Sequence, residues 1–341
     1  MVQKSDKVRI KQMINDLFKA FLDKVGLFDL FGRFLPTATL PIIMYHNIGN
    51  PELDWLYEKP LPPSVFELQI KYLKKLGYSM LTLSEALTSV RKGERKRIAV
   101  LTFDDGYSGI YKYAFPIMRK YNVRGTVFVS SSFVEEDAIP WWEKVAFITS
   151  RLPVPARLNL ELFGTIIVNK ESDKRSIAQV IIRRLQVKDI DYINLIIEEL
   201  MNISGIDIPN TFEVPIMIKR DHLKEMVEYG IEIGGHGVHH VSLPKLTQYR
   251  LREELYGSLS FVKKYCKSDP MTFAYPFGAF DNRVIKNLKS VGFDAAVTME
   301  PFVNNTKSLD LYRLGRIPPY GSAREIMASF KYNLLIKSFI R

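Results

Sequence analysis

Apolar and polar positions along this 341-residue chain alternate in blocks that predict strands followed by helices. Short apolar runs predict strands at 41–45, 79–82, 97–103, 125–130, 231–235, 271–275 and 294–299. Apolar residues at helical spacing predict helices at 64–76, 84–92, 112–120, 220–229, 247–266 and 281–290. Ser64 and Glu67 are predicted to form a capping box at the first helix. Repeated strand–helix units with short loops predict an α/β fold whose parallel sheet closes, or nearly closes, into a barrel.

The strand–helix rhythm breaks between residues 137 and 215. That stretch has two predicted helices, at 172–186 and 188–203, without the strands that would pair them into the sheet. We interpret it as an insertion in a barrel domain. The expected domains are an N-terminal amphipathic helical segment at 1–36, the barrel at 37–325 and a C-terminal tail at 326–341.

The N-terminal segment carries apolar residues at helical spacing between Ile14 and Phe28. Such a face either packs on the domain or lies on a membrane surface, since aromatic residues and lysines flank it. No stretch reaches the roughly 18 apolar residues of a membrane-spanning helix, and no signal peptide is recognised. We therefore expect a cytoplasmic or peripheral-membrane protein.

Composition and charge narrow the possible classes of protein only slightly. Hydrophobic residues make up 47% and charged residues 25% of the chain, which is usual for a soluble globular protein. The net charge of +11 is spread along the chain without a long basic run or a nucleic-acid-binding signature, so no nucleic-acid partner is expected. The single cysteine, Cys266, excludes an internal disulfide and a Cys-rich zinc site.

Polar residues follow the predicted strands at 97–103 and 231–235, and their types suggest a catalytic or metal-binding site. Asp104 and Asp105 follow the first, and two adjacent carboxylates repel each other unless a cation or hydrogen-bond donors balance them. His236 and His240 follow the second, four residues apart, a spacing that on a helical turn places both imidazoles on one face. His239 is assigned to the loop.

Strand ends of an α/β barrel meet at one rim, so these groups are expected to lie together. One carboxylate and two imidazoles make the three protein ligands of a catalytic metal with an open position. Zinc is the expected ion, and cobalt or nickel would fit the same ligands. The segment FAYPFG, 273–278, follows a third strand and brings a turn to the same rim.

The order of these motifs, TFDDG, GxHxxxH, FAYPFG and LYRLGRI (311–317), resembles the polysaccharide deacetylases of the NodB-homology superfamily, carbohydrate esterase family four, in their FxYPxG-type branch. The resemblance runs from about residue 40 to 320. It implies a distorted (β/α)7 TIM-like barrel with a helical insertion. It also implies a metal-dependent hydrolase of carbon–nitrogen bonds that removes N-acetyl groups from N-acetylglucosamine-type sugars of a polysaccharide, oligosaccharide or glycolipid.

The resemblance assigns roles to residues of the three motifs. Asp104 corresponds to the general base. The implied metal ligands are Asp105, His236 and His240. Phe277 stands where a backbone N–H would stabilise the developing oxyanion, with Tyr275 beside it as a second substrate contact.

The sequence departs from the usual family pattern at three places. Gly237 replaces the hydroxyl residue that usually follows the first metal histidine. Ala274 stands where an arginine would support the catalytic aspartate, so we expect Arg316 to take that role, with Arg313 as second choice. No histidine follows His240, which removes the usual C-terminal acid.

His46, after the strand at 41–45, is the predicted substitute acid, with strand-end packing as the alternative. These departures favour the biosynthetic deacetylases of exopolysaccharides or other cell-surface glycans, with an acetylated glycan as partner. Trp141 and Trp142 either stack on sugar rings or anchor the insertion to the barrel. Two alternative functions stay open: an amidohydrolase of another small amide or formylated sugar, and a catalytically degenerate glycan-binding barrel.

Overall fold

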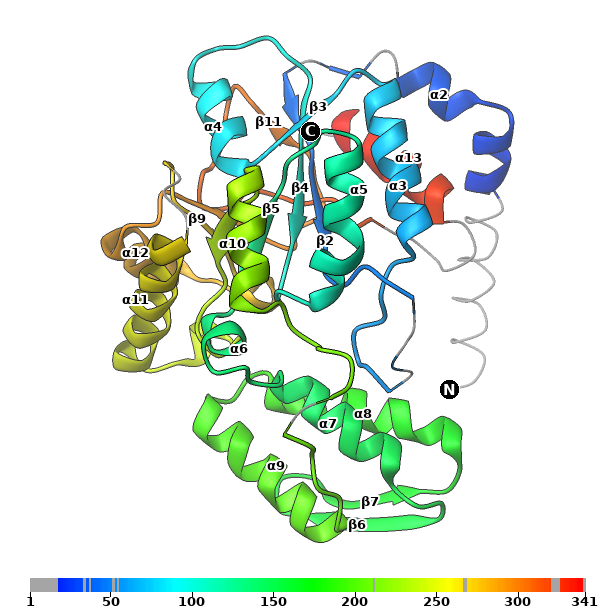
Figure 1. The fold of residues 1–341 in the computed structure, drawn as a ribbon, viewed down its shortest axis with the longest axis vertical. Helices are drawn as coiled ribbons and strands as arrows, with labels where there is room; N and C mark the ends of the chain where they lie inside the picture. The colour runs from blue at the N-terminus through cyan, green and yellow to red at the C-terminus, as the bar shows by residue number, and fades with distance from the viewer. Residues whose placement is uncertain are drawn as a thin grey trace.

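A seven-stranded parallel sheet forms the centre of the protein, as a computed structural model shows for residues 18–32, 35–36, 38–50, 53, 55–210, 212–265, 269–319 and 326–339 (Figure 1). The strand order is β10-β9-β8-β5-β4-β2, and β3 also pairs with β4. The strands are β2 (Ile42–Tyr45), β3 (Ser79–Leu81), β4 (Ile98–Phe103), β5 (Thr126–Val129), β8 (Glu232–Gly235), β9 (Thr272–Ala274) and β10 (Ala295–Val297). All seven predicted strands are therefore confirmed.

The sheet curls, and an irregular segment links its two edge strands. Leu314 pairs with Val297 of β10, and Ile317 pairs with Ile43 of β2, both in the parallel direction. Residues 314–317 thus complete the ring that β10 and β2 leave open. The expected distorted (β/α)7 barrel is confirmed.

Side-chain alternation along β4 separates two cores. Val100 belongs to a small cluster with residues from strands all around the ring, including Ile42, Phe128 and Val297, and such residues can meet only on its inner side. Leu101 points the other way, into the large cluster between the sheet and the helices. Because side chains alternate with a period of two, every second side chain after Val100 also faces the inside of the ring, up to the end of the strand.

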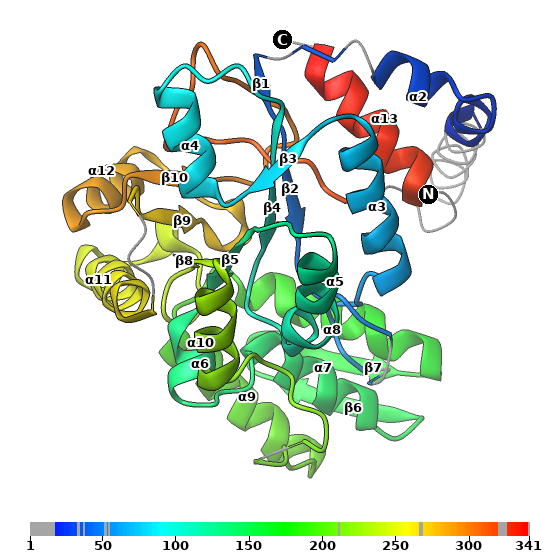
Figure 2. The same cartoon turned by 45° about the horizontal axis from the view of Figure 1, so that its top comes forward.

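Helices cover the outside of the sheet (Figures 1 and 2). They are α3 (Pro63–Lys75), α4 (Leu83–Arg91), α5 (Phe115–Lys120), α10 (Arg220–Tyr229), α11 (Gln248–Tyr265) and α12 (Asn282–Val291). Each predicted helix is present, although a π-helical turn (Ile110–Ala114) precedes α5.

The predicted capping box at α3 is wrong. The helix begins at Pro63, with Pro62 as an N-cap that makes no side-chain capping bond. Glu67 instead accepts hydrogen bonds from Lys120 Nζ at 2.8 Å and Tyr121 Oη at 2.5 Å. The proline pair sets the start of the helix one residue earlier because its fixed φ is already helical.

The stretch interpreted as an insertion holds more structure than its two predicted helices. Those helices, α8 (Glu171–Leu185) and α9 (Ile190–Ser204), are confirmed. They are accompanied by a further helix and an antiparallel hairpin, namely α7 (Trp141–Arg151), β6 (Ala156–Leu160) and β7 (Gly164–Val168). Together these elements form a separate layer next to the barrel (Figure 1). The short helix α6 (Ser131–Glu135) leads into this layer from β5.

The helical segments nearest the two chain ends, residues 18–32 and 326–339, lie together on one side of the barrel (Figure 2). Residues 18–24 are helical, and α2 (Leu27–Gly32) follows them. The stretch expected as a tail contains α13 (Ile326–Phe339), which meets the N-terminal helices through Lys331 Nζ, 2.6 Å from Asp23 Oδ1. A two-stranded pairing, β1 (Thr39–Leu40) with β11 (Asn304–Asn305), lies outside the main sheet.

The predicted apolar face at 14–28 divides into a buried part and an exposed part, and residues 1–17 lie outside the described residues. Phe28 is buried, whereas Phe18 and Phe21 are each more than half exposed. In the parts of the chain that the structure describes, no helix has the length and apolar character to cross a bilayer. Membrane association and cellular location stay predictions.

Candidate active site

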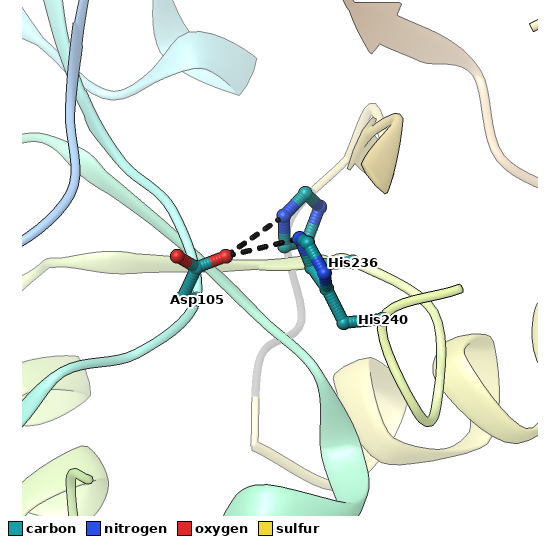
Figure 3. Close-up of side chains that lie close together, drawn as sticks. All are labelled: Asp105, His236 and His240. Atoms are coloured by element: carbon teal, nitrogen blue, oxygen red, sulfur yellow. Dashed lines mark ion pairs between the residues drawn. The ribbon is translucent and has the colours of Figure 1, made fainter. Parts of the chain in front are cut away.

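Three predicted metal ligands meet at the carboxyl ends of two strands (Figure 3). Asp105 follows β4, and His236 and His240 follow β8. Asp105 Oδ1 lies 3.3 Å from His236 Nε2 and 3.2 Å from His240 Nε2. All three side chains are buried, and among the described residues they are the only group of three or more such ligands close enough to hold one ion.

The donor atoms of this cluster fit a divalent cation. His236 Nδ1 lies 2.7 Å from the carbonyl oxygen of Ala274, which can only accept, so the proton is on Nδ1 and Nε2 carries a lone pair. Asp105 Oδ1 is buried without a hydrogen-bond partner in the described structure. Two ligand atoms bound tetrahedrally at about 2.0–2.1 Å from an ion stand about 3.3 Å apart, which matches both spacings.

The ionisation of Asp105 agrees with this interpretation. Burial by itself would raise the pKa of its carboxyl group, but the adjacent imidazoles of His240 and His236 outweigh that effect. The pKa of Asp105 therefore lies well below its usual value, and the carboxyl group is a charged ligand. Its left-handed backbone, with φ at 71°, turns the chain sharply after β4, a conformation that Asp tolerates better than most residues.

A loop, not a helical turn, brings the two imidazoles together, so that part of the prediction is wrong. The backbone is left-handed at Gly237, with φ at 77°, and at His240, with φ at 54°. Glu254 of α11 holds the loop by accepting hydrogen bonds from the backbone N–H of Val238 at 2.7 Å and from that of His239 at 3.2 Å. His239 Nδ1 also lies 2.7 Å from Glu254, so this imidazole belongs to the loop, as predicted.

Gly237→Ser, which restores the usual family residue, is expected to destabilise the fold by about 1–3 kcal/mol and to weaken metal binding. The added Cβ would lie 2.9 Å from Glu254 Oε2, on a backbone that glycine adopts more easily than serine. Gly205→Ser is the control, because Gly205 is also left-handed but has nothing within 4 Å of an added Cβ. Thermal unfolding and zinc titration of both variants make the comparison; equal zinc affinity in both would contradict the expectation.

Asp104 and Arg316 form a buried ion pair beside the cluster. Arg316 Nη1 and Nη2 donate to Asp104 Oδ1 at 2.6 Å and Oδ2 at 2.7 Å, and Arg316 Nε donates to the carbonyl of Thr298 at 2.8 Å. Burial by itself would raise the pKa of Asp104, but the guanidinium outweighs it and the pKa is lowered. Arg316 thus supports Asp104 in the way predicted for the missing arginine. Arg313, the second choice, is half exposed and donates a hydrogen bond to Asn282.

His46 directly follows β2, near the same carboxylates. Its Nδ1 is buried without a hydrogen-bond partner in the described structure. Burial by itself would lower the pKa of His46, but the negative charges of Glu58, Asp105 and Asp104 outweigh it, and the pKa is raised. Sequence reasoning missed Glu58, which lies in the loop between β2 and α3 and has no motif to distinguish it.

The two residues expected to contact substrate differ in their placement. The Phe277 ring lies against the His240 ring, with centroids 4.5 Å apart, and its backbone is left-handed with φ at 58°. The Tyr275 side chain is fully buried, and its hydroxyl donates to the carbonyl of Tyr312 at 3.1 Å. Phe277 is therefore brought to the cluster, whereas the hydroxyl of Tyr275 is used elsewhere.

The first turn of α7 packs directly against the candidate site. Trp141 and Trp142 are both buried, which favours anchoring over stacking on sugar rings. Trp141 Nε1 donates to the carbonyl of His240 at 3.2 Å, and the Trp142 ring lies 4.6 Å from the His240 ring. The layer next to the barrel thus contacts a candidate metal ligand.

A curled barrel with a buried Asp/His/His cluster at its carboxyl end defines an α/β-barrel protein with a candidate catalytic metal centre. The model of the polysaccharide deacetylase family matches residues 91–296, which is more than half of the chain. The chain belongs to the polysaccharide deacetylase family, as its motifs predicted, and it is a deacetylase of the carbohydrate esterase family four type.

Two relatives and one solved structure illustrate the similarity. Bacillus subtilis YxkH, which is named for this family, is 23% identical over 283 residues, 82% of this chain and 71% of that protein. The poly-beta-1,6-N-acetyl-D-glucosamine N-deacetylase of Staphylococcus aureus is 24% identical over 259 residues, 73% of this chain and 64% of that protein, less than two thirds of its length. The Streptococcus pyogenes deacetylase PplD, solved with acetate, has a TM-score of 0.57 at 19% identity, covering 89% of this chain and 99% of that one, and shows the same fold.

Proposed function

We propose that this deacetylase is a metal-dependent hydrolase that removes acetyl groups from N-acetylglucosamine units of a polysaccharide, oligosaccharide or glycolipid. The observation that carries the proposal is the convergence of two imidazole nitrogens on the unpartnered oxygen of Asp105, beside an arginine-paired second carboxylate. A binding barrel has no need for that second carboxylate next to a metal centre.

Asp105, His236 and His240 would hold the ion, and zinc is the best match to two imidazoles and one carboxylate. Cobalt and nickel suit the same ligands. A bound divalent ion supplies Lewis acidity towards the acetyl carbonyl and lowers the pKa of a water molecule.

Asp104 acts as the proton acceptor in this proposal. The carboxylate keeps lone pairs free, because Arg316 uses one on each oxygen. Arg316 also holds the group in one orientation, since the guanidinium is itself fixed by the carbonyl of Thr298. The proton that Asp104 accepts comes from the attacking water.

His46 acts as the proton donor to the departing nitrogen. Water adds to the acetyl carbon, the carbon–nitrogen bond breaks, and a proton from the His46 imidazolium gives the free amine and acetate. The raised pKa of His46 favours the protonated form that this step needs. The backbone N–H of Phe277 would stabilise the negative charge that develops on the acetyl oxygen.

The relatives and the motifs support the proposed substrate class. One relative is named for deacetylation of poly-β-1,6-N-acetylglucosamine, and we propose a related acetylated cell-surface glycan here. Because sequence identity is 24%, the linkage and polymer length are not carried over.

The test is acetate release from poly-β-1,6-N-acetylglucosamine oligomers and from chitooligosaccharides. Removal of metal by a chelator is expected to lower the rate about 100-fold or more, and zinc or cobalt should restore it. Direct metal analysis of the same samples gives the ion content. Acetate release that is unchanged after the ion is gone would contradict metal dependence, and stoichiometric metal without acetate release would contradict the substrate class.

A further inference from the structure

Glu143, in the first turn of α7, is a fully buried carboxylate outside the candidate metal cluster. Its Oε2 accepts a hydrogen bond from the backbone N–H of Tyr57 at 2.8 Å, and its Oε1 accepts one from that of Glu58 at 3.3 Å. Oε1 also accepts the hydroxyl proton of Tyr107 at 2.6 Å. One side chain therefore joins three segments: α7, the loop at 55–59 and the loop after β4.

The direction of these hydrogen bonds is fixed by their donors. The indole Nε1–H of Trp142 can only donate, and it lies 2.7 Å from the Tyr107 hydroxyl oxygen. The Tyr107 proton is therefore left for Glu143. Trp142 also packs on His240, so the same turn of α7 touches the candidate metal ligand and the loop at 55–59.

The loop at 55–59 is held from a second side as well. Arg175 of α8 donates to the carbonyl of Leu56 at 3.2 Å and to that of Tyr57 at 2.8 Å. Beyond the loop, the backbone N–H of Leu61 donates to the carbonyl of Asn47 at 2.9 Å. This last bond brings the chain back to the end of β2, next to His46.

Glu58 lies in this returning loop, and its backbone N–H is held by Glu143. Burial by itself would lower the pKa of His46, and the negative charge of Glu58 is one of those that raise it. Glu58 also interacts electrostatically with Asp105. None of the residues assigned from the family motifs lies in this loop.

We propose that Glu143 is a positioning residue that holds the loop at 55–59, and with it Glu58, beside His46 at the end of β2, and that this loop is part of the active site. The proposal rests on the deacetylase function proposed above. It gives the layer next to the barrel a role in catalysis, because α7 and α8 supply both anchors of the loop.

Glu143→Gln is the decisive substitution because it keeps the size and removes the acceptor pattern. Three donors converge on the carboxylate, whereas a glutamine offers one acceptor oxygen and an NH2 group that would oppose a donor. Hydrogen exchange followed by mass spectrometry at pH 8 should show faster exchange at the amides of Tyr57 and Glu58, by about tenfold or more. At that pH the carboxyl group, whose pKa burial raises to about 7, is ionised.

Activity provides the second measurement. Glu143→Gln and Glu58→Gln are each expected to lower kcat/KM for acetate release by about tenfold or more, with metal content unchanged. If Glu143 acts through the loop, the double variant should be no worse than the more severe single variant by more than about twofold. Independent, multiplied effects would overturn the proposal.

Glu232→Gln is the matched control. Glu232 is also a buried carboxylate with converging donors, the backbone N–H of Ser84 at 2.9 Å and the hydroxyls of Thr126 and Thr272, but it lies in β8 at the amino end of the strand. This variant should lose stability without faster exchange at Tyr57 and Glu58. Equal loop exchange in both variants would overturn the proposal by showing a general loss of structure.

The proposed function and the positioning role of Glu143 can be disproved separately. If wild-type protein with bound metal releases no acetate, the proposed function is wrong, and the exchange experiment still tests the anchoring of the loop. If wild-type protein is active but Glu143→Gln changes neither loop exchange nor kcat/KM, the positioning role is wrong and the proposed function stands.

Discussion

Asp104→Asn is expected to lower kcat/KM for acetate release by about 10²–10⁴-fold, because an amide cannot accept the proton of the attacking water. The metal ligands stay in place, so zinc content should be unchanged. The asparagine NH2 would oppose one nitrogen of Arg316, and some stability should be lost as well. Acetate release at saturating metal, measured below the unfolding temperature, makes the test.

Asp105→Asn distinguishes the role of Asp105 from that of the adjacent Asp104. It removes a charged ligand, so its activity should fall together with zinc affinity and should recover in part at high zinc. Asp104→Asn should not recover with added zinc. Activity of Asp104→Asn within tenfold of wild type would show that another group accepts the proton.

Arg316→Met is expected to destabilise the protein by about 3–5 kcal/mol, because it leaves the Asp104 carboxylate buried and unpaired. Arg316→Lys should recover only part of this loss, since lysine cannot make two parallel hydrogen bonds to the carboxylate and a third to Thr298. Activity should fall in both variants because the base loses its fixed orientation. Urea unfolding at constant zinc gives the free energies.

Arg313→Met is the control for the same segment. Arg313 is three residues away and half exposed, and its hydrogen bond is to Asn282. Surface substitutions of this kind usually change stability by less than about 0.5 kcal/mol. If Arg313→Met and Arg316→Met lower the free energy of unfolding by the same amount, the buried ion pair does not stabilise this edge of the barrel.

The alternation of apolar segments predicted the barrel because the strands are short and mostly buried, and amphipathic helices follow most of them. The run at 97–103 is an example: all six residues of β4 are buried, so no exposed position interrupts the strand. The start of α3 was wrong because Ser64 and Glu67 match a capping box locally, while the Pro62-Pro63 pair and the partners of Glu67 decide the outcome.

The predicted residues of the candidate metal cluster do lie together, although the helical turn expected to bring the two histidines together is not present. The spacing of His236 and His240 suggested a helical turn, but left-handed backbone at Gly237 and His240 brings the imidazoles together instead. Residue types and strand order were enough to select the right groups. The path between them depends on Glu254, sixteen positions beyond Val238, whose contact no local pattern reports.

Glu58 and Glu143 could not be found from the sequence. Glu143 follows two tryptophans in a helix and looks like an ordinary polar position, yet it is fully buried. Its partners at Tyr57 and Glu58 precede it by more than eighty positions. Buried charge held by distant backbone donors has no periodicity, so only the three-dimensional structure identifies it.

The segment at 314–317 ties completion of the barrel to completion of the catalytic pair. Arg316 lies between the two backbone pairings that bridge β10 and β2, and it reaches Asp104 from 212 positions away. During synthesis, the strands up to β10 emerge before this segment, so Asp104 has no counter-charge and the sheet keeps two open edges until the ribosome has passed Ile317. A chain that stops short of Arg316 therefore lacks both the closing segment and the partner of its base.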